Sequence, residues 1–262
     1  MGALQDQGVV VTGAGRGIGR ALATRAAREG ARVVVNDLDE ANAQKVADEI
    51  GGTAVAGDVT APEELIDAAT RTLGRIDVFF ANAGIDGAGG PDSLQTEDAV
   101  WDRVLDVNVM AHVRAARALV PRWLEDGQGG RFAVTASAAG LLTMIGSAPY
   151  SVTKHAAVGF AEWLSVTYGS RGIDVHAICP QGVKTQMLEE AGPLQALLSR
   201  DSALEPEQVA EAAIAAIEEG RFLVLPHPEV AGYYAARATD TEKWLGGMRR
   251  LQQKIDEAGA LG

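Results

Sequence analysis

Residues 8–19 read Gly-Val-Val-Val-Thr-Gly-Ala-Gly-Arg-Gly-Ile-Gly, a short β-branched run that passes into a glycine-rich turn. The next stretch, Ile18–Glu29, has the apolar spacing of a helix. A strand, a glycine turn and a helix in this order let backbone N–H groups approach a pyrophosphate closely at the helix N-terminus. The glycines are spaced G-x-x-x-G-x-G, since Ile18 stands where the common dinucleotide pattern has glycine. The segment predicts a nucleotide-binding sheet, and a tight turn without a ligand is the alternative.

The alternation of strand and helix continues through most of the chain. Short apolar runs are predicted as buried strands at Gly8–Thr12, Arg32–Asn36, Thr53–Ala56, Ile76–Ala81, Arg131–Ala136, Ile173–Ile178 and Arg221–Leu225. Helical spacing is found at Ile18–Glu29, Glu40–Ile50, Pro62–Leu73, Val100–Leu124, Tyr150–Ser170 and Pro206–Glu219. Because the strands are apolar throughout, helices should cover both faces of the sheet. The sequence therefore predicts an α/β fold, a three-layer doubly wound parallel sheet of about seven strands.

The 262 residues show no linker that would divide the chain. A domain usually has about 150 residues, so this length fits one or two domains. We predict a single domain over residues 1–262, with 233–262 as a helical C-terminal extension. Apolar residues of that tail fall at helical spacing: Trp244, Leu245, Met248, Leu251 and Ile255.

The net charge of −12 arises from 23 Lys and Arg against 35 Asp and Glu. Such an acidic chain repels phosphate backbones and anionic lipids, so neither a nucleic acid nor a membrane is expected as a partner. Cys179 is the only cysteine, which excludes an internal disulfide and favours a reducing compartment. Since Met1–Gly8 lacks the basic and apolar runs of a leader, we expect the protein in the cytoplasm. No metal site is expected, because ligand spacing is absent among the histidines: His112, His155, His176 and His227.

Two charged residues near the glycine turn bear on the choice between NAD and NADP. Asp37 follows the second predicted strand, where a carboxylate accepts hydrogen bonds from the adenosine ribose and repels a 2′-phosphate. Arg16, inside the turn, favours NADP instead, since a cation can bind that phosphate. Repulsion between two anions is a penalty, whereas an arginine can turn to solvent. The sequence therefore predicts NAD, with NADP as the alternative.

A second group of polar residues lies after mid-chain. Ser137 follows a predicted strand, and Tyr150 and Lys154 lie one helical turn apart on the same face. The pKa of a free tyrosine is about 10, too high for acid/base chemistry at neutral pH. A lysine one turn away, with a positively charged nicotinamide beside it, would lower that pKa. By itself, a Tyr-x-x-x-Lys pair more often marks a solvated helix face.

The functional interpretation of Tyr150 and Lys154 depends on the other residues near the ends of the predicted strands. Besides the glycine turn, five polar or turn positions lie just beyond predicted strands: Asp37, Asp58, Asn82, Ser137 and Pro180. The carboxyl ends of parallel strands share one crevice, and ligands of such sheets bind there.

With these motifs the sequence resembles the short-chain dehydrogenase/reductase family. The shared motifs follow the family order over residues 8–185: Thr12-Gly13-x-x-x-Gly17-x-Gly19, Asp58-Val59, Asn82-Ala83-Gly84, Asn108, Ser137 and Tyr150-x-x-x-Lys154. The resemblance implies a Rossmann fold and hydride transfer between a nicotinamide cofactor and a small alcohol or ketone.

The resemblance also implies a role for each matching residue. Tyr150 would be the general acid/base, Ser137 would bind the substrate oxygen, and Lys154 would hold the nicotinamide ribose and lower the pKa of Tyr150. Asn108 would anchor a water that links Lys154 to solvent. Besides Tyr150 and Lys154, the cofactor would contact Gly13, Arg16, Gly17, Ile18, Gly19, Asp37, Asp58, Val59, Asn82, Ala83, Gly84, Pro180, Val183 and Thr185.

The chain departs from the family pattern at two motifs and in its tail. Ala81 replaces the first Asn of Asn-Asn-Ala-Gly, with little expected consequence. Gln181 stands in the glycine slot of Pro-Gly-x-Val-x-Thr, where it either faces the substrate or points away. The tail continues well past the last predicted strand and would cap the substrate pocket or pack on a neighbouring subunit.

Apolar residues near these motifs favour a hydrophobic secondary alcohol or ketone. Leu142 and Met144 precede Tyr150, and Met187 follows Thr185, as do Leu194, Leu197 and Leu198. The same residues are compatible with a purely structural core. With Gln181, the residues Leu142, Met144 and Met187 are the substrate candidates.

Three functions remain open at this point. The favoured one is an NAD-dependent alcohol dehydrogenase, and the second is an NADP-dependent carbonyl reductase at the same site. The third is a dinucleotide-binding redox sensor without turnover, which would have no need of an acid/base group. The resemblance further implies a homotetramer or dimer through the helices at Val100–Leu124 and Tyr150–Ser170.

Overall fold

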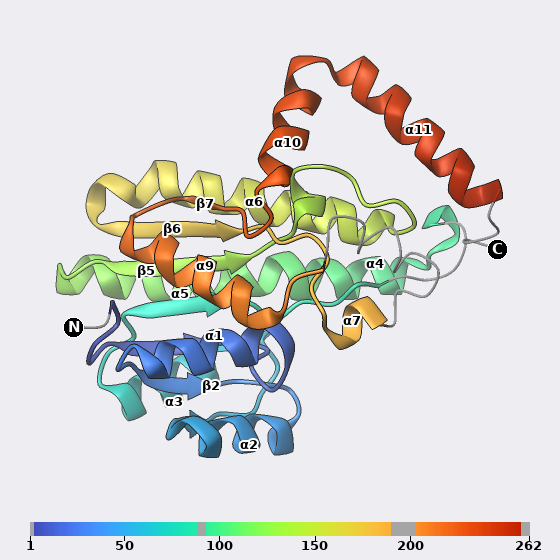
Figure 1. Cartoon of the computed structure of the whole chain (residues 1–262). Coiled ribbons are helices and arrows are strands. Elements are labelled where there is room, and N and C mark those ends of the chain that lie inside the picture. The colour runs from blue at the N-terminus through green and yellow to red at the C-terminus, as the bar shows by residue number, and fades with distance from the viewer. Residues whose placement is uncertain (1–2, 88–92, 190–202, 258–262) are drawn as a thin grey trace.

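A parallel sheet of seven strands forms the centre of the computed structural model, which describes residues 3–87, 93–189 and 203–257 (Figure 1). Its strand order is β3-β2-β1-β4-β5-β6-β7. The strands are β1 (Gly8–Val11), β2 (Arg32–Val35), β3 (Thr53–Ala54), β4 (Val78–Ala81), β5 (Gly130–Thr135), β6 (Ile173–Ile178) and β7 (Leu223–Val224). Every predicted strand is confirmed. The direction of winding reverses between β1 and β4, which opens a crevice at the carboxyl ends of these strands.

Helices cover both faces of the sheet, so the predicted three-layer arrangement is confirmed (Figure 1). Successive residues of β1 pack on opposite faces: Val10 packs toward α3, α5 and α6, while Val9 and Val11 pack toward α1, α2 and α9. The helices are α1 (Gly17–Arg28), α2 (Glu40–Ile50), α3 (Pro62–Leu73), α4 (Asp98–Leu105), α5 (Ala111–Asp126), α6 (Ala148–Tyr168), α7 (Gln186–Glu189), α9 (Pro206–Glu218), α10 (Glu229–Thr239) and α11 (Thr241–Glu257).

The helix predicted at Val100–Leu124 is interrupted. It consists of α4, a π-helical turn at Asp106–Met110, and α5. Asn108 lies inside the π turn, where its side chain is held by hydrogen bonds to the main chain of Ile85. Such turns relax the regular helical ladder and often occur at functional sites.

The predicted C-terminal extension is helical over its described part, and it begins earlier than expected. It forms two helices, α10 from Glu229 and α11 up to Glu257, which stand away from the sheet on one side of the molecule (Figure 1). Val230 of α10 is fully buried in the core on the α6 side. Within the described ranges, we find no helix with the length and hydropathy needed to cross a bilayer.

Candidate active site at the carboxyl edge of the sheet

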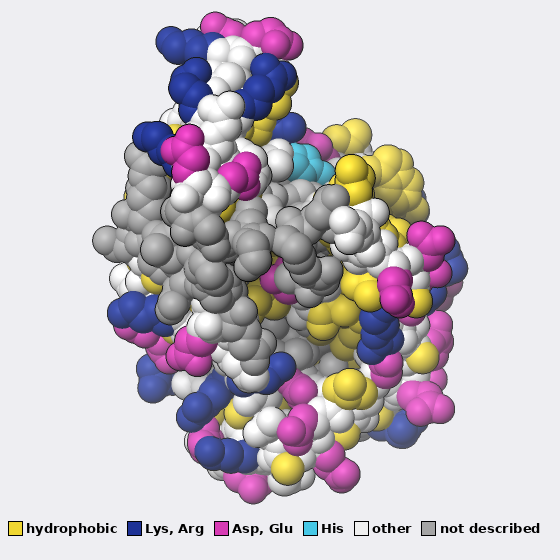
Figure 2. Space-filling model, turned by 90° about the vertical axis from the view of Figure 1, so that its right-hand side faces the viewer, with side chains coloured by type: hydrophobic (Ala, Val, Ile, Leu, Met, Phe, Trp, Pro, Cys, Tyr) yellow, Lys and Arg dark blue, Asp and Glu magenta, His cyan; other side chains and the backbone are white. Residues whose placement is uncertain are grey.

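A cleft of about 1430 Å³ opens where the strands end. All the predicted cofactor, catalytic and substrate residues line it except Asn108, which is fully buried behind it. Figure 2 looks onto this edge of the molecule and shows hydrophobic side chains gathered in the hollow. The sequence prediction that these loops converge at one crevice is therefore met, although Leu194, Leu197 and Leu198 lie outside the described residues.

The glycine turn passes close to its neighbours at Gly13 and Gly19, which carry no side chains. Gly13 has φ of 60°, and a Cβ there would lie 2.9 Å from Ala83 Cα. A Cβ on Gly19 would collide with the carbonyl oxygen of Gly13. Arg16 precedes α1 and makes no side-chain cap, so the amide groups of the first helical turn are available to an anion. The turn has the form required to hold a pyrophosphate.

Asp37 lies directly beside this turn. Its Oδ2 accepts a hydrogen bond of 2.8 Å from the amide of Gly15, and its Oδ1 accepts one of 3.0 Å from the amide of Asp39. Arg16 points to the opposite side of the cleft, where its guanidinium donates to Oε1 of Gln186 in α7. The carboxylate therefore stays at the end of β2, while the arginine contacts the segment that follows β6.

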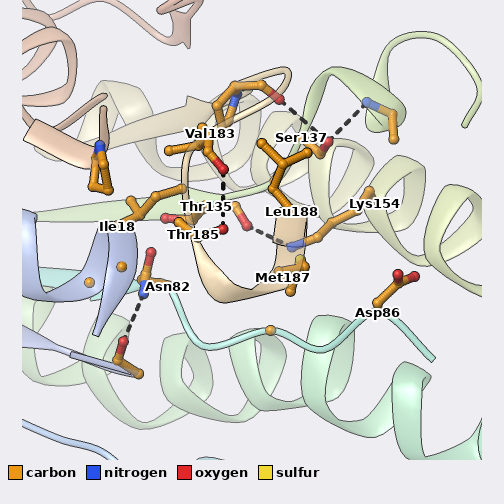
Figure 3. Close-up of a pocket in the computed structure, with 18 of the residues that line it drawn as sticks. Ile18, Asn82, Asp86, Thr135, Ser137, Lys154, Val183, Thr185, Met187 and Leu188 are labelled. Atoms are coloured by element: carbon orange, nitrogen blue, oxygen red, sulfur yellow. Dashed lines mark hydrogen bonds between the residues drawn. The ribbon is translucent and has the colours of Figure 1, made fainter. Parts of the chain in front are cut away.

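The loop after β4 is tied to the glycine turn. Asn82 Nδ2 donates to the carbonyl oxygen of Thr12 at 2.9 Å, and the amide of Asn82 donates to Thr12 Oγ1 at 2.9 Å (Figure 3). Further along the cleft, Asp58 accepts from the amide of Thr60, and this hydrogen bond lowers the pKa of the carboxyl together with nearby Arg103. Asn82 thus holds two strand ends in register at the predicted cofactor site.

Lys154 and Tyr150 lie on one face of α6, as predicted. The Lys154 Nζ lies 5.5 Å from the centre of the Tyr150 ring and donates to the carbonyl oxygen of Thr135 at 2.9 Å. Ser137, just after β5, accepts from the amide of Ala139 at 3.1 Å and lies within hydrogen-bonding reach of the Tyr150 phenol. The three side chains from β5 and α6 therefore meet at one wall of the cleft.

Burial shifts the pKa values of both Tyr150 and Lys154. It raises the pKa of Tyr150 to about 12, because the phenol lies deep in the cleft, where a phenolate is poorly hydrated. The hydrogen bond to Ser137 lowers this pKa, and the charge of Asp86 raises it. Burial also lowers the pKa of Lys154 to about 8. In the protein without a cofactor, the pKa of Tyr150 is therefore raised. The sequence analysis predicted a lowered pKa, for a phenol with both Lys154 and a nicotinamide cation beside it.

Asn108 connects α6 to the loop after β4. Its Oδ1 accepts from the amide of Ile85 at 2.9 Å, and its Nδ2 donates to the carbonyl oxygen of Ile85 at 2.9 Å and to Thr153 Oγ1 at 3.1 Å. Gly84 lies just beside it, where a Cβ would come within 3.2 Å of Lys154 Nζ. The Asn108 side chain thereby joins Thr153, the residue before Lys154, to the loop after β4. The water relay implied by the resemblance stays a prediction.

The segment after β6 closes the cleft from the other side. Pro180 accepts from the amide of Ala138, and Thr185 reaches the glycine turn, since its Cγ2 lies 3.2 Å from where a Cβ on Gly17 would be. The amide of Gln181 donates to Nδ1 of His227 at 3.1 Å. Gln181 lines the cleft, and its contact with a substrate stays a prediction.

Sequence reasoning missed the contribution of Asp86 to the cleft wall. Asp86 stands two residues after the Asn82-Ala83-Gly84 run, and burial raises the pKa of its carboxyl (Figure 3). Its Oδ1 is buried without a hydrogen-bond partner among the described residues. A charged side chain so soon after a strand end was the available signal. The tail was expected either to cap the substrate pocket or to pack on a neighbouring subunit. It lines the cleft with Tyr233, Ala236, Trp244, Met248 and Leu251.

Comparisons with known proteins agree with this geometry. Residues 7–195 match the sequence profile of the short chain dehydrogenase family. The chain is 40% identical over 194 residues to 1-deoxy-11-beta-hydroxypentalenate dehydrogenase of Streptomyces exfoliatus, covering 71% of this chain and 70% of that protein. It is 33% identical over 220 residues to the mitochondrial borneol dehydrogenase of Lavandula x intermedia, covering 80% and 83%. A short chain dehydrogenase/reductase from Burkholderia phymatum, solved in complex with NAD, matches with a TM-score of 0.83 and 29% identity over 92% of this chain and 96% of that chain.

Proposed function

The chain belongs to the short-chain dehydrogenase/reductase family, and we propose that it interconverts an apolar secondary alcohol and its ketone with NAD, using Tyr150 as the general acid/base. It is an oxidoreductase acting on CH–OH groups. The observation that carries the proposal is the meeting of Ser137, Tyr150 and Lys154 at the wall of a cleft that also contains the glycine turn. A protein that only senses a dinucleotide has no use for these three side chains.

NAD, when bound, supplies the acceptor for the hydride that leaves the carbinol carbon. The residues of this chain bind the substrate oxygen and transfer its proton. Ser137 binds the substrate oxygen beside Tyr150, and the Tyr150 phenolate takes the hydroxyl proton as the C–O bond becomes a carbonyl. Lys154, fixed by the carbonyl oxygen of Thr135, places a positive charge near that phenolate and stabilises it. In the reverse direction Tyr150 returns the proton to the ketone oxygen.

The preference for NAD is supported by the charges at the end of β2. Asp37 holds its carboxylate against the Gly15 amide, where the adenosine ribose of a nucleotide on this turn would lie. A 2′-phosphate there would meet a like charge. Arg16, the residue that favoured NADP, is engaged with Gln186. NADP-dependent carbonyl reduction is the second candidate, and it rests on Arg16 leaving this contact.

The substrate class is supported by the apolar cleft wall. Leu142 and Met144 line the cleft before α6, and Met187 lines it from α7. Two similar proteins carry the names of alicyclic alcohol dehydrogenases, one for hydroxypentalenate and one for borneol. An apolar ring alcohol is therefore the best fit for this site.

The experiment is a measurement of NADH formation with a panel of secondary alcohols, run with NAD and with NADP. Turnover with NAD that disappears in Tyr150→Phe is the expected result. Turnover with NADP alone would replace the NAD assignment by the reductase. Tight NAD binding without turnover of any alcohol or ketone would favour a sensor instead.

We also propose that the protein is a homo-oligomer. On α6, Val152, Trp163 and Val166 are exposed, and Val166 is 84% exposed. Burying this apolar face against a second copy would remove it from water. A sedimentation measurement that finds a monomer at micromolar concentration would contradict this proposal.

A further inference from the structure

We infer that the C-terminal helices form the outer wall of the substrate site: Trp244 and Met248 of α11 contact the apolar body of a bulky alcohol, and Arg237 of α10 holds them in place. This inference rests on the proposed function and extends it to a part of the chain beyond the matched family segment, which ends at residue 195.

One face of α11 is turned toward the cleft. Trp244, Met248 and Leu251 line it, and their spacing of four and three residues places them on a single stripe of the helix. Leu245, beside Trp244, is not among the lining residues. Charged residues of the helix, such as Arg249 and Arg250, are exposed. The helix is therefore amphipathic, with its apolar stripe directed at the site.

Arg237 joins this helix to the catalytic machinery. Its Nη1 donates to the carbonyl oxygens of Leu141 and Leu142 and lies 3.0 Å from Nε2 of His155. Its guanidinium lies 5.2 Å from the centre of the Trp244 ring, within the range of a cation–π contact. One side chain thus links the loop between β5 and α6, helix α6 itself and the wall formed by α11.

The imidazole of His155 is set to accept from this arginine. Its Nδ1 lies 2.8 Å from the carbonyl oxygen of Ser151, which can only accept, so Nδ1 carries the hydrogen. Nε2 then has a free lone pair for the Arg237 N–H. His155 follows Lys154 directly, so the contact fixes the position of α11 relative to the reacting groups.

The chemistry of the wall selects for size. An indole ring, the Met248 thioether and the Leu251 side chain offer an apolar, adaptable surface. A bicyclic alcohol whose carbinol lies at Ser137 and Tyr150 extends toward this surface, whereas 2-propanol is too small to span the cleft. Arg237 touches neither substrate nor cofactor in this arrangement and acts as a positioning residue.

The test is calorimetric titration of borneol into the protein saturated with NADH, in which the alcohol binds without turnover. Wild type, Trp244→Ala and Met248→Ala are compared with Leu245→Ala, an apolar truncation on the same helix outside the lining stripe. We expect Trp244→Ala to weaken borneol binding about 10- to 100-fold, the loss that follows from removing one large apolar contact. Met248→Ala should weaken it in the same direction, and Leu245→Ala should bind as wild type does.

The variant Arg237→Met tests the role of Arg237 in positioning α11. It should raise KM for borneol oxidation while leaving kcat, KM for 2-propanol and the NADH affinity near wild-type values. Equal borneol affinity in wild type and Trp244→Ala would overturn the inference, and so would a wild type that binds NADH but no borneol. Loss of the proposed function has a different signature, namely no NADH binding or no turnover of any alcohol.

Discussion

Lys154 Nζ lies 5.5 Å from the centre of the Tyr150 ring and is fixed at 2.9 Å from the carbonyl oxygen of Thr135. The end of β5 therefore sets the position of the cation relative to the phenol, and the spacing on α6 supplies only the shared face. Burial acts on both groups, raising the pKa of Tyr150 to about 12 and lowering that of Lys154 to about 8. Groups this close titrate as a pair, so pH profiles report the pair rather than either residue alone.

Replacing Tyr150 by Phe removes the phenol oxygen and leaves the ring. We expect kcat to fall about 10²- to 10⁴-fold, the range for loss of a general acid/base. NADH affinity and thermal stability should change little, because the ring still packs against the site. Steady-state kinetics with a turned-over alcohol and fluorescence titration of NADH check this. A variant that keeps a tenth of wild-type kcat would assign the proton transfer to another group.

The Asp86 carboxylate should affect how kcat/KM for alcohol oxidation depends on pH. Its negative charge raises the pKa of Tyr150, because it opposes a second negative charge on the phenolate. Removing it in Asp86→Asn lowers that pKa, so the rise of kcat/KM for alcohol oxidation with pH should move to lower pH. The control is Asp98→Asn, an exposed carboxylate of α4 outside the cleft, whose profile should match wild type. A shift to higher pH in Asp86→Asn would contradict the electrostatic assignment.

Cofactor choice should depend on Asp37. We expect Asp37→Ser to raise the ratio of kcat/KM with NADP to that with NAD about 10- to 100-fold, since a charged hydrogen bond to the ribose is lost and repulsion of a 2′-phosphate ends. Asp39→Ser is the matched control, because that exposed carboxylate caps α2 two residues away. Its ratio should stay near wild type. If Asp37→Ser leaves the ratio unchanged, the cofactor assignment loses its main support.

Most of the fold and the polar part of the site could be predicted from local sequence signals. Gly13 and Gly19 occupy positions where a Cβ does not fit, so the turn requires glycine and the pattern is readable in sequence. Asp37 and Ser137 follow apolar strands, and parallel strands bring such ends together. These features depend on neighbours in sequence and on one rule of sheet geometry.

The parts that sequence reasoning missed depend on contacts between distant segments. The π turn around Asn108 leaves the apolar spacing of its helix almost unchanged, so periodicity does not detect it. The stripe of Trp244 in α11 predicts an amphipathic helix, but it does not distinguish the substrate pocket from a neighbouring subunit as the surface that the apolar face contacts. The pKa of Tyr150 depends on burial in the cleft, whereas the sequence shows only the nearby lysine. Residue spacing therefore identifies which side chains form the site, but it does not show how burial shifts their pKa values.

Acid stability offers a test of burial at His112, which lies on α5 behind the site. Burial, aided by the charge of Lys154, lowers the pKa of His112 from 6.5 to about 3. Between these two pKa values the unfolded chain binds a proton that the folded protein does not, so the free energy of unfolding falls as pH falls. One such group contributes a slope of about 1.4 kcal/mol per pH unit.

The measurement is urea unfolding of wild type and His112→Gln from pH 7 to about pH 5, because carboxyl groups, with ordinary pKa values of about 4, stay mostly ionised there. The glutamine does not titrate. The slope of the free energy of unfolding against pH should therefore be smaller than in wild type, by the equivalent of about one bound proton. His176 contributes to the same window, because burial lowers its pKa as well, and His176→Gln provides a comparison at a second buried site. Parallel curves for wild type and His112→Gln would mean that His112 is protonated in the folded protein, which its burial beside Lys154 opposes.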